Sequence, residues 1–229
     1  MSSSALIVGA GSGLSASLAR RCHAAGMQVA LAARDGEKAR SVAQETGASL
    51  HRFDAASIKD VAALFAALDA SIGAPDLVVY NPSARLRGPV TELNPKATRA
   101  AIEVTCFGAF LVAQQAARRM LARGSGTILF TGASAGVKGF ANSSVFAMGK
   151  FGLRGLAQSL ARELHPQNIH IGHFVIDGGI ASERQGRKND GSDQMLDPDA
   201  IADAYLQFHN QHRSAWSWEV ELRPWVEKF

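Results

Sequence analysis

The chain has 229 residues, of which 47% are hydrophobic and 19% are charged, and its formal net charge at pH 7 is +4. These values exclude an intrinsically disordered chain, and the length suits one large α/β domain better than two. The basic residues are scattered in pairs such as Arg20-Arg21 and Arg118-Arg119, so the charge does not indicate nucleic-acid binding.

The cysteines and the N-terminus bear on the cellular compartment. Cys22 and Cys106 lie in helical patterns without metal-ligand spacing, which is typical of free thiols in a reducing compartment. The N-terminus has no basic segment followed by a long apolar run, so neither a signal peptide nor a membrane span is predicted. We therefore expect a cytoplasmic protein without a metal site.

Short apolar runs alternate with helical patterns along the whole chain. The first part predicts strands over residues 5–8 and 28–33, another before Asp54 and one over 77–80, with helices over 14–25, 37–46 and 57–72. The second part predicts a long helix over 95–123, a strand over 127–130, a helix over 144–164, a strand over 170–176, a helix over 198–210 and a last strand over 218–222.

Strands that read as continuous apolar runs, each followed by a helix, are typical of a parallel sheet covered on both faces. We therefore expect one α/β domain over residues 1–229, a doubly wound (Rossmann) parallel sheet of about seven strands with helices on both faces. Residues 182–196 interrupt the alternation, because they are polar and contain glycine, and we expect them to form a lid over the substrate.

A glycine-rich turn, Gly-Ala-Gly-Ser-Gly-Leu-Ser at residues 9–15, joins the first strand to the first helix. Glycines in such a turn let the backbone approach a pyrophosphate, and the helix N-terminus offers free N–H groups. The turn therefore predicts a dinucleotide site with contacts from Gly9, Gly11, Ser12, Gly13 and Leu14.

The second strand indicates which dinucleotide binds. A carboxylate at its end would hold the ribose 2′-hydroxyl of NAD, whereas this chain has Ala33 followed by Arg34. A guanidinium suits a phosphate, so we expect NADP(H) to be preferred over NAD(H). Asp54 and Asn81 follow the third and fourth strands and are further candidates for nucleotide contacts. The alternative is that Arg34 is a surface charge and that the other two are turn formers.

These motifs resemble the short-chain dehydrogenase/reductase family, whose turn reads Gly-x-x-x-Gly-x-Gly. Gly9 and Gly13 match that pattern, and Ser15 stands at the third glycine. The resemblance extends over essentially the whole chain. It implies a nicotinamide-dependent oxidoreductase that acts on a small molecule and forms a homodimer or homotetramer through the helices at 95–123 and 144–164.

The resemblance also assigns the catalytic positions, because the family uses an Asn-Ser-Tyr-Lys tetrad whose tyrosine donates the proton. Lys150 matches the lysine, where it also binds the nicotinamide ribose. The other three positions hold Phe146 for tyrosine, Ala133 for serine, with Ser134 one residue out of register, and Thr105 for asparagine. Only one member of the tetrad is therefore retained.

After the sixth strand the family has Pro-Gly-x-x-x-Thr, and this chain has Asp-Gly-Gly-Ile-Ala-Ser at 177–182. The resemblance implies cofactor contacts from Gly178, Ile180 and Ser182. Asp177 in place of proline is a candidate acid or base. The substrate pocket is expected to lie among residues 84–90, 137–143 and 182–196, which hold few polar groups that point to one ligand.

Three hypotheses remain open from the sequence. The protein is a working NADP-dependent oxidoreductase with an altered proton relay, an NADP(H)-binding sensor or partner subunit without catalysis, or a scaffold that no longer binds nucleotide. In the first, the proton comes from Ser134, Ser143, Ser144, Asp177, Lys150 or water, or the substrate is an activated double bond that needs little protonation. The intact glycine turn and Arg34 argue against the third.

Overall fold

A computed structural model describes residues 3–182, 186–187 and 190–227. Its main sheet has seven parallel strands in the order β3-β2-β1-β4-β5-β6-β9. The strands are β1 Ser4–Val8, β2 Gln28–Ala33, β3 Ser49–Arg52, β4 Leu77–Tyr80, β5 Gly126–Thr131, β6 Ile169–Ile176 and β9 Glu219–Leu222. A separate parallel pair joins β7 Gly179–Ile180 to β8 Met195–Leu196.

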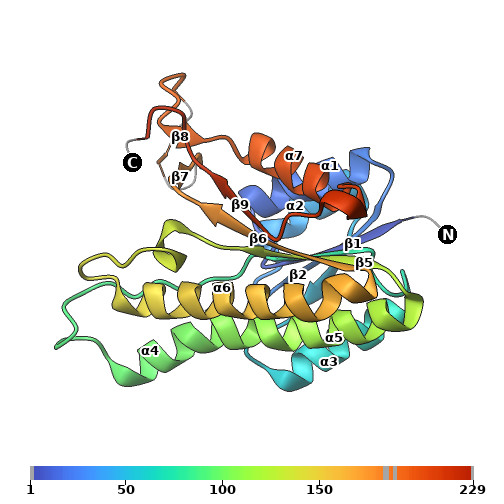
Figure 1. Cartoon of the computed structure of the whole chain (residues 1–229), viewed down its shortest axis with the longest axis horizontal. Helices are drawn as coiled ribbons and strands as arrows, with labels where there is room; N and C mark the ends of the chain where they lie inside the picture. Colours follow the sequence, from blue (N-terminus) through green and yellow to red (C-terminus); the bar gives the residue numbers. More distant parts are fainter. Residues whose placement is uncertain (1–2, 183–185, 188–189, 228–229) are drawn as a thin grey trace.

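Helices cover both faces of this sheet (Figure 1). The α-helices are α1 Leu14–Ala24, α2 Glu37–Thr46, α3 Ile58–Asp69, α4 Pro95–Ile102, α5 Gly108–Arg123, α6 Ser144–Leu164 and α7 Pro198–His209. Short helical turns are η1 Glu103–Phe107, η2 Ser134–Gly136, η3 His165–Gln167 and η5 Arg213–Ala215. Helices α1, α2 and α7 lie on one face and α3 to α6 on the other, so the predicted doubly wound fold is confirmed.

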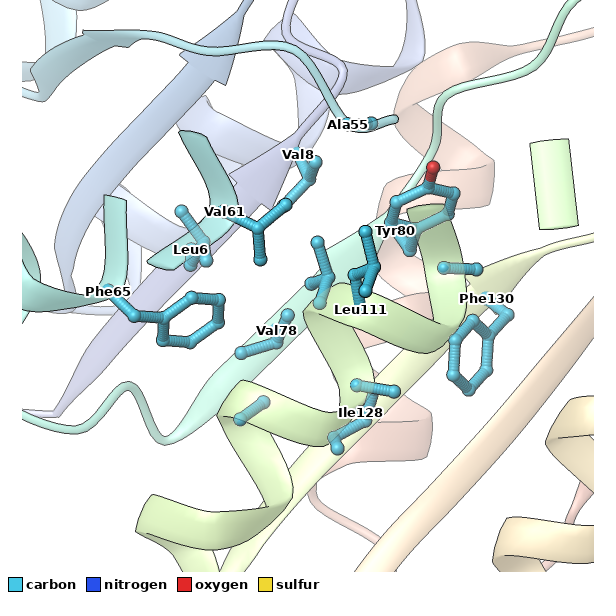
Figure 2. Packing of buried hydrophobic residues seen from close by; sticks show 14 of the residues in the cluster. Leu6, Val8, Ala55, Val61, Phe65, Val78, Tyr80, Leu111, Ile128 and Phe130 are labelled. Atoms are coloured by element: carbon cyan, nitrogen blue, oxygen red, sulfur yellow. The ribbon is translucent and has the colours of Figure 1, made fainter. Parts of the chain in front are cut away.

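Two apolar layers fill the space between the sheet and its helices. On one side Phe65 of α3 and Leu111 of α5 pack on β-strand residues such as Val78 and Ile128 (Figure 2). On the other side α1, α2 and α7 bury a second cluster that includes Leu18, Tyr205 and Phe208. Because both faces are covered, the central strands are fully buried, which explains why they read as unbroken apolar runs.

The helix starts follow the expected local chemistry. Ser57 caps α3, since its hydroxyl accepts the N–H of Asp60 and donates to the Asp60 carboxylate. Asn94 caps α4 ahead of Pro95 in the first turn. The predicted C-terminal end of the third helix, at residue 72, was wrong, because α3 ends at Asp69.

The long helix predicted over 95–123 is present, but a π-helical segment, η1, separates α4 from α5. The hydroxyl of Tyr80 on β4 donates to the Val104 carbonyl in this segment. Gly108 follows, and a Cβ there would lie 2.6 Å from both the Ala55 carbonyl oxygen and the Tyr80 hydroxyl. Contacts with Tyr80 of β4 therefore hold the π-helical segment η1 in place, and helical periodicity in the sequence does not reveal such contacts.

By length and composition alone, the run Pro95–Arg123 could cross a membrane. In this fold its two α-helices form part of one layer, in which α5 packs on α3 and β5 and α4 packs on α6.

Candidate functional site

A pocket of about 520 Å³ opens at the carboxyl ends of the central strands. Parallel strands place the loops that follow them at this edge, the usual position of ligand sites in such sheets. The residues that line the pocket are Gly11, Ser12, Gly13, Leu14, Asn81, Ser83, Arg85, Thr131, Gly132, Ala133, Phe146, Lys150, Ile176, Gly178, Ile180, Ala181, Ser182 and Arg187.

The glycine turn forms one wall of this pocket. Gly9 has a φ of 84°, and a Cβ there would lie 2.8 Å from the Pro82 nitrogen, so only glycine fits. A Cβ at Gly11 or Gly13 would meet nothing within 4 Å, which leaves open space beside the backbone. Helix α1 begins there without a side-chain cap and without an acidic residue in its first turn, so its N-terminus suits an anion.

Ser15 and Asn81 hold this turn in place. The Ser15 hydroxyl donates to the Gly9 carbonyl at 3.0 Å and accepts the Asn81 side-chain amide at 2.8 Å. The serine at the third glycine position therefore connects the turn to the end of β4. Asn81 lines the pocket, and its amide nitrogen supports the turn.

Replacing Ser15 by alanine should destabilise the fold. The change leaves the Gly9 carbonyl and the Asn81 amide without their shared partner, which costs about 1–2 kcal/mol and about 2–6 °C in Tm. Ser17→Ala is the matched control, because that buried hydroxyl on the same helix makes no hydrogen bond to the described residues. Thermal unfolding of the two variants checks this, and equal Tm values would contradict the role of Ser15.

Lys150 is a buried cation in the pocket wall. Its side chain on α6 is 2% exposed, and its Nζ donates to the Thr131 carbonyl at 2.6 Å. Burial, followed by the positive charge of Arg85, lowers the pKa of Lys150 to about 7. No carboxylate within the described ranges forms an ion pair with it, so its proton can be gained and lost near neutral pH.

The positions assigned to tyrosine and serine meet in an apolar contact. Phe146 and Ala133 both line the pocket, and with Ala135 they form a small hydrophobic cluster. The two tyrosines of the chain do not line the pocket. Tyr80 bonds to Val104, and Tyr205 donates from α7 to the Thr131 hydroxyl at 2.9 Å, on the opposite side of the sheet from α6. Burial raises the pKa of both phenols.

Thr105 and Ser134 do not line the pocket. The Thr105 hydroxyl is buried in the π segment and accepts the Ala84 N–H at 3.0 Å, so it supports the chain that leaves β4. Ser134 begins η2, where its carbonyl accepts the N–H groups of Val137 and Lys138. Ser143 and Ser144, at the start of α6, also lie outside the lining.

Asp177 is held in ion pairs away from the pocket lining. Its carboxylate lies 2.9 Å from a nitrogen of Arg223 and 3.6 Å from the Lys138 Nζ. The carboxylate therefore has two cationic partners, and Asp177 does not belong to the pocket lining.

The expected contacts after β6 and part of the expected lid surround the pocket. Gly178, Ile180 and Ser182 line it, and Ser182 forms an antiparallel bridge with Arg187. Strand β8, at the end of the predicted lid over 182–196, pairs with β7, which precedes the lid. Residues 183–185 and 188–189 of the predicted lid lie outside the described residues.

Arg34 and Asp54 lie outside the pocket lining. Arg34 is exposed directly after β2, and it forms no hydrogen bond or ion pair with the described part of the chain. Asp54 uses a carboxylate oxygen to accept the Ala56 N–H at 3.0 Å, as a turn former does. The carboxylate nearest to Arg34 in sequence, Asp35, accepts the Glu37 N–H and pairs with Lys38.

Sequence reasoning did not single out Arg85, Arg187 or Thr131, nor the lining residues Ser83, Gly132, Ile176 and Ala181. Arg85 lies in the segment 84–90, which was expected to form the pocket but to hold few polar groups that point to a ligand. A cation four residues after Asn81 was the available signal. No group of three His, Cys, Asp or Glu side chains in the described ranges is arranged to hold a metal ion.

Comparison with known proteins gives related sequences and structures. A family model of short chain dehydrogenases matches residues 3–193. A 3-dehydrosphinganine reductase of Arabidopsis thaliana is 31% identical over 172 residues, which are 72% of this chain and 51% of that protein. This chain thus spans about half the length of that relative.

Two solved structures are similar over nearly their whole length. A short-chain dehydrogenase from Rhodopseudomonas palustris is 34% identical with a TM-score of 0.82, over 96% of this chain and 99% of that one. A metagenomic short-chain oxidoreductase in complex with NADP is 28% identical with a TM-score of 0.85, over 98% of both chains.

Proposed function

Because this chain belongs to the short-chain dehydrogenase family, we propose that it is an NAD(P)-dependent oxidoreductase that uses NADP(H) to reduce a small carbonyl or activated double-bond compound. The proposal includes a proton relay that differs from the Asn-Ser-Tyr-Lys tetrad of the family. The observation that carries it is the buried Lys150 amine, which lines the same pocket as the glycine turn.

The residues at the glycine turn fit a dinucleotide. Open space beside Gly11 and Gly13 and the uncapped start of α1 suit a pyrophosphate, and Gly178, Ile180 and Ser182 continue the same wall. A bound NADPH would supply a hydride, which carries two electrons, to the substrate. The related oxidoreductase that was crystallised with NADP adds support for this cofactor.

Lys150 is the group best placed to supply the proton. Of the side chains considered as donors, it alone belongs to the pocket lining, since Ser134, Ser143, Ser144 and Asp177 lie elsewhere. A pKa of about 7 allows it to carry a proton at neutral pH and to release it readily. In the net reaction the carbonyl carbon gains the hydride, the oxygen gains the proton from Lys150, and solvent reprotonates the amine.

Replacing Arg34 by glutamine should weaken NADPH binding about 10- to 100-fold while NADH binding stays the same, because only NADPH carries the 2′-phosphate. Arg40→Gln, which removes an exposed guanidinium already paired with Glu37, is the control. Fluorescence titration with both dinucleotides checks this. If Arg34→Gln lost the same affinity for NADH as for NADPH, the cofactor preference would be contradicted. If the wild type bound neither dinucleotide, the proposed function would be contradicted.

The second candidate function is an NADP(H)-binding sensor or partner subunit without catalysis. The apolar cluster of Phe146, Ala133 and Ala135 favours it, because packing replaces the hydroxyl groups that the family uses there. Lys150 would then serve only the cofactor ribose. This alternative predicts NADPH binding without turnover on any carbonyl or enone.

The expected homodimer or homotetramer, the cytoplasmic location and the single-domain organisation remain predictions. Exposed aromatic residues on the outer helices support self-association: Phe107 and Phe110 stack at 6.1 Å beside the start of α5, and Phe151 lies on α6. Burying such residues against a second copy would remove apolar surface from water.

A further inference from the structure

Arg85 is a pocket cation that the proposed proton relay does not use. It follows β4, and its guanidinium carbon lies 4.3 Å from the centre of the Phe146 ring. The side chain is exposed to the pocket side, and it forms neither a hydrogen bond nor an ion pair with any residue the structure describes. Its hydrogen-bond donors are therefore available to a ligand.

The surroundings of Arg85 are strongly positive. The pocket lining includes Arg85, Lys150 and Arg187, and it contains no aspartate and no glutamate among the described residues. Partial burial, then the charges of Arg87 and Arg187, lower the pKa of Arg85, and Arg85 in turn lowers that of Lys150. An anion bound to Arg85 would relieve the repulsion between Arg85 and Lys150.

The position of the guanidinium restricts where this anion sits relative to the reacting group. Arg85 stacks on the ring at position 146, and the Lys150 Nζ lies 5.7 Å from the centre of the same ring. Both cations contact the same ring, so one small ligand can meet Lys150 with a carbonyl oxygen and Arg85 with a negatively charged group. A planar guanidinium binds a carboxylate through two parallel hydrogen bonds, which fixes the orientation of the ligand.

We propose that Arg85 binds the carboxylate of a small oxo acid whose carbonyl is reduced. This inference rests on the proposed function and names its substrate class. The carbonyl carbon receives the hydride and its oxygen the proton, NADPH becomes NADP⁺, and the carboxylate is unchanged. The product is the corresponding hydroxy acid.

The first test compares 2-oxo and 3-oxo acids with their methyl esters, which keep the carbonyl but lose the charge, by following NADPH oxidation. The wild type is expected to favour the acids about 10- to 100-fold in kcat/KM, and Arg85→Gln should abolish this preference. Arg87→Gln, which removes a neighbouring charge outside the pocket lining, should keep it. Equal use of acids and esters by the wild type would overturn the inference.

The second test separates failure of this inference from failure of the proposed function. Oxalate, a dicarboxylate that cannot be reduced in this way, is titrated calorimetrically into the NADPH complex of the wild type and of both variants. Binding that weakens at least tenfold only in Arg85→Gln supports the anion site even without turnover. Turnover of neutral ketones without oxalate binding would overturn the anion site and leave the proposed function standing.

Discussion

Lys150→Met is expected to lower kcat for carbonyl reduction about 100- to 10,000-fold, the usual contribution of a positioned proton donor. Methionine keeps the apolar stem of the side chain and removes only the amine that bonds to Thr131. Lys138→Met, which removes a half-exposed amine paired with Asp177 outside the pocket lining, should change kcat by less than about twofold. Steady-state kinetics measure both, and an unchanged kcat in Lys150→Met would contradict a donor role.

The same lysine should determine the pH dependence of reduction. Because the donor must carry its proton, the wild-type rate is expected to fall as the pH rises above about 7, and the residual rate of Lys150→Met should not show this step. If Lys150 served only to bind the ribose, Lys150→Met would raise the Kd for NADPH and would keep the pH profile of kcat of the wild type.

Stability should respond to pH in the opposite direction. The pKa of Lys150 falls from 10.5 to about 7 on folding, so between these values the unfolded chain binds more protons than the folded one. The free energy of unfolding therefore rises with pH across that window. Relative to the wild type, Lys150→Met should be most stable below pH 7 and lose that advantage towards pH 10, as thermal unfolding at several pH values would reveal.

Phe146→Tyr combined with Ala133→Ser is expected to raise kcat about tenfold or more, because it restores two hydroxyl groups on neighbouring pocket positions. The new phenol would lie near the cations Arg85 and Lys150, which favour its ionised form and lower its pKa. Phe140→Tyr adds a ring hydroxyl on an exposed residue outside the pocket lining and serves as the control.

The double variant also separates the two leading functions. Turnover in the wild type that increases in the variant supports a working enzyme with a different relay. NADPH binding with turnover only in the variant would establish that the natural chain is a binding protein. No turnover in either would show that Phe146 and Ala133 do not limit the reaction.

The expected elements and the observed ones agree where the signal is local. Alternation of buried strands with helices predicted the sheet, and the predicted helix starts at residues 57 and 95 agree with α3 and α4, which Ser57 and Asn94 cap. The π segment was not predictable in this way, because the Tyr80 hydroxyl that bonds to it comes from β4, 24 residues earlier. Lys150 stood out through a resemblance, but its lowered pKa follows from burial in the folded chain and from the charge of Arg85.

The sequence by itself determined the fold class and the glycine-turn end of the pocket, since strand and helix periodicity and glycine turns depend on residues near one another in the chain. Only the tertiary structure decided the chemistry of the pocket. It stacks Arg85 on Phe146, binds Asn81 to Ser15 across 66 residues, and excludes Thr105 and Ser134 from the lining. These contacts join separate loops at one edge of the sheet, and their geometry depends on how the strands and helices pack.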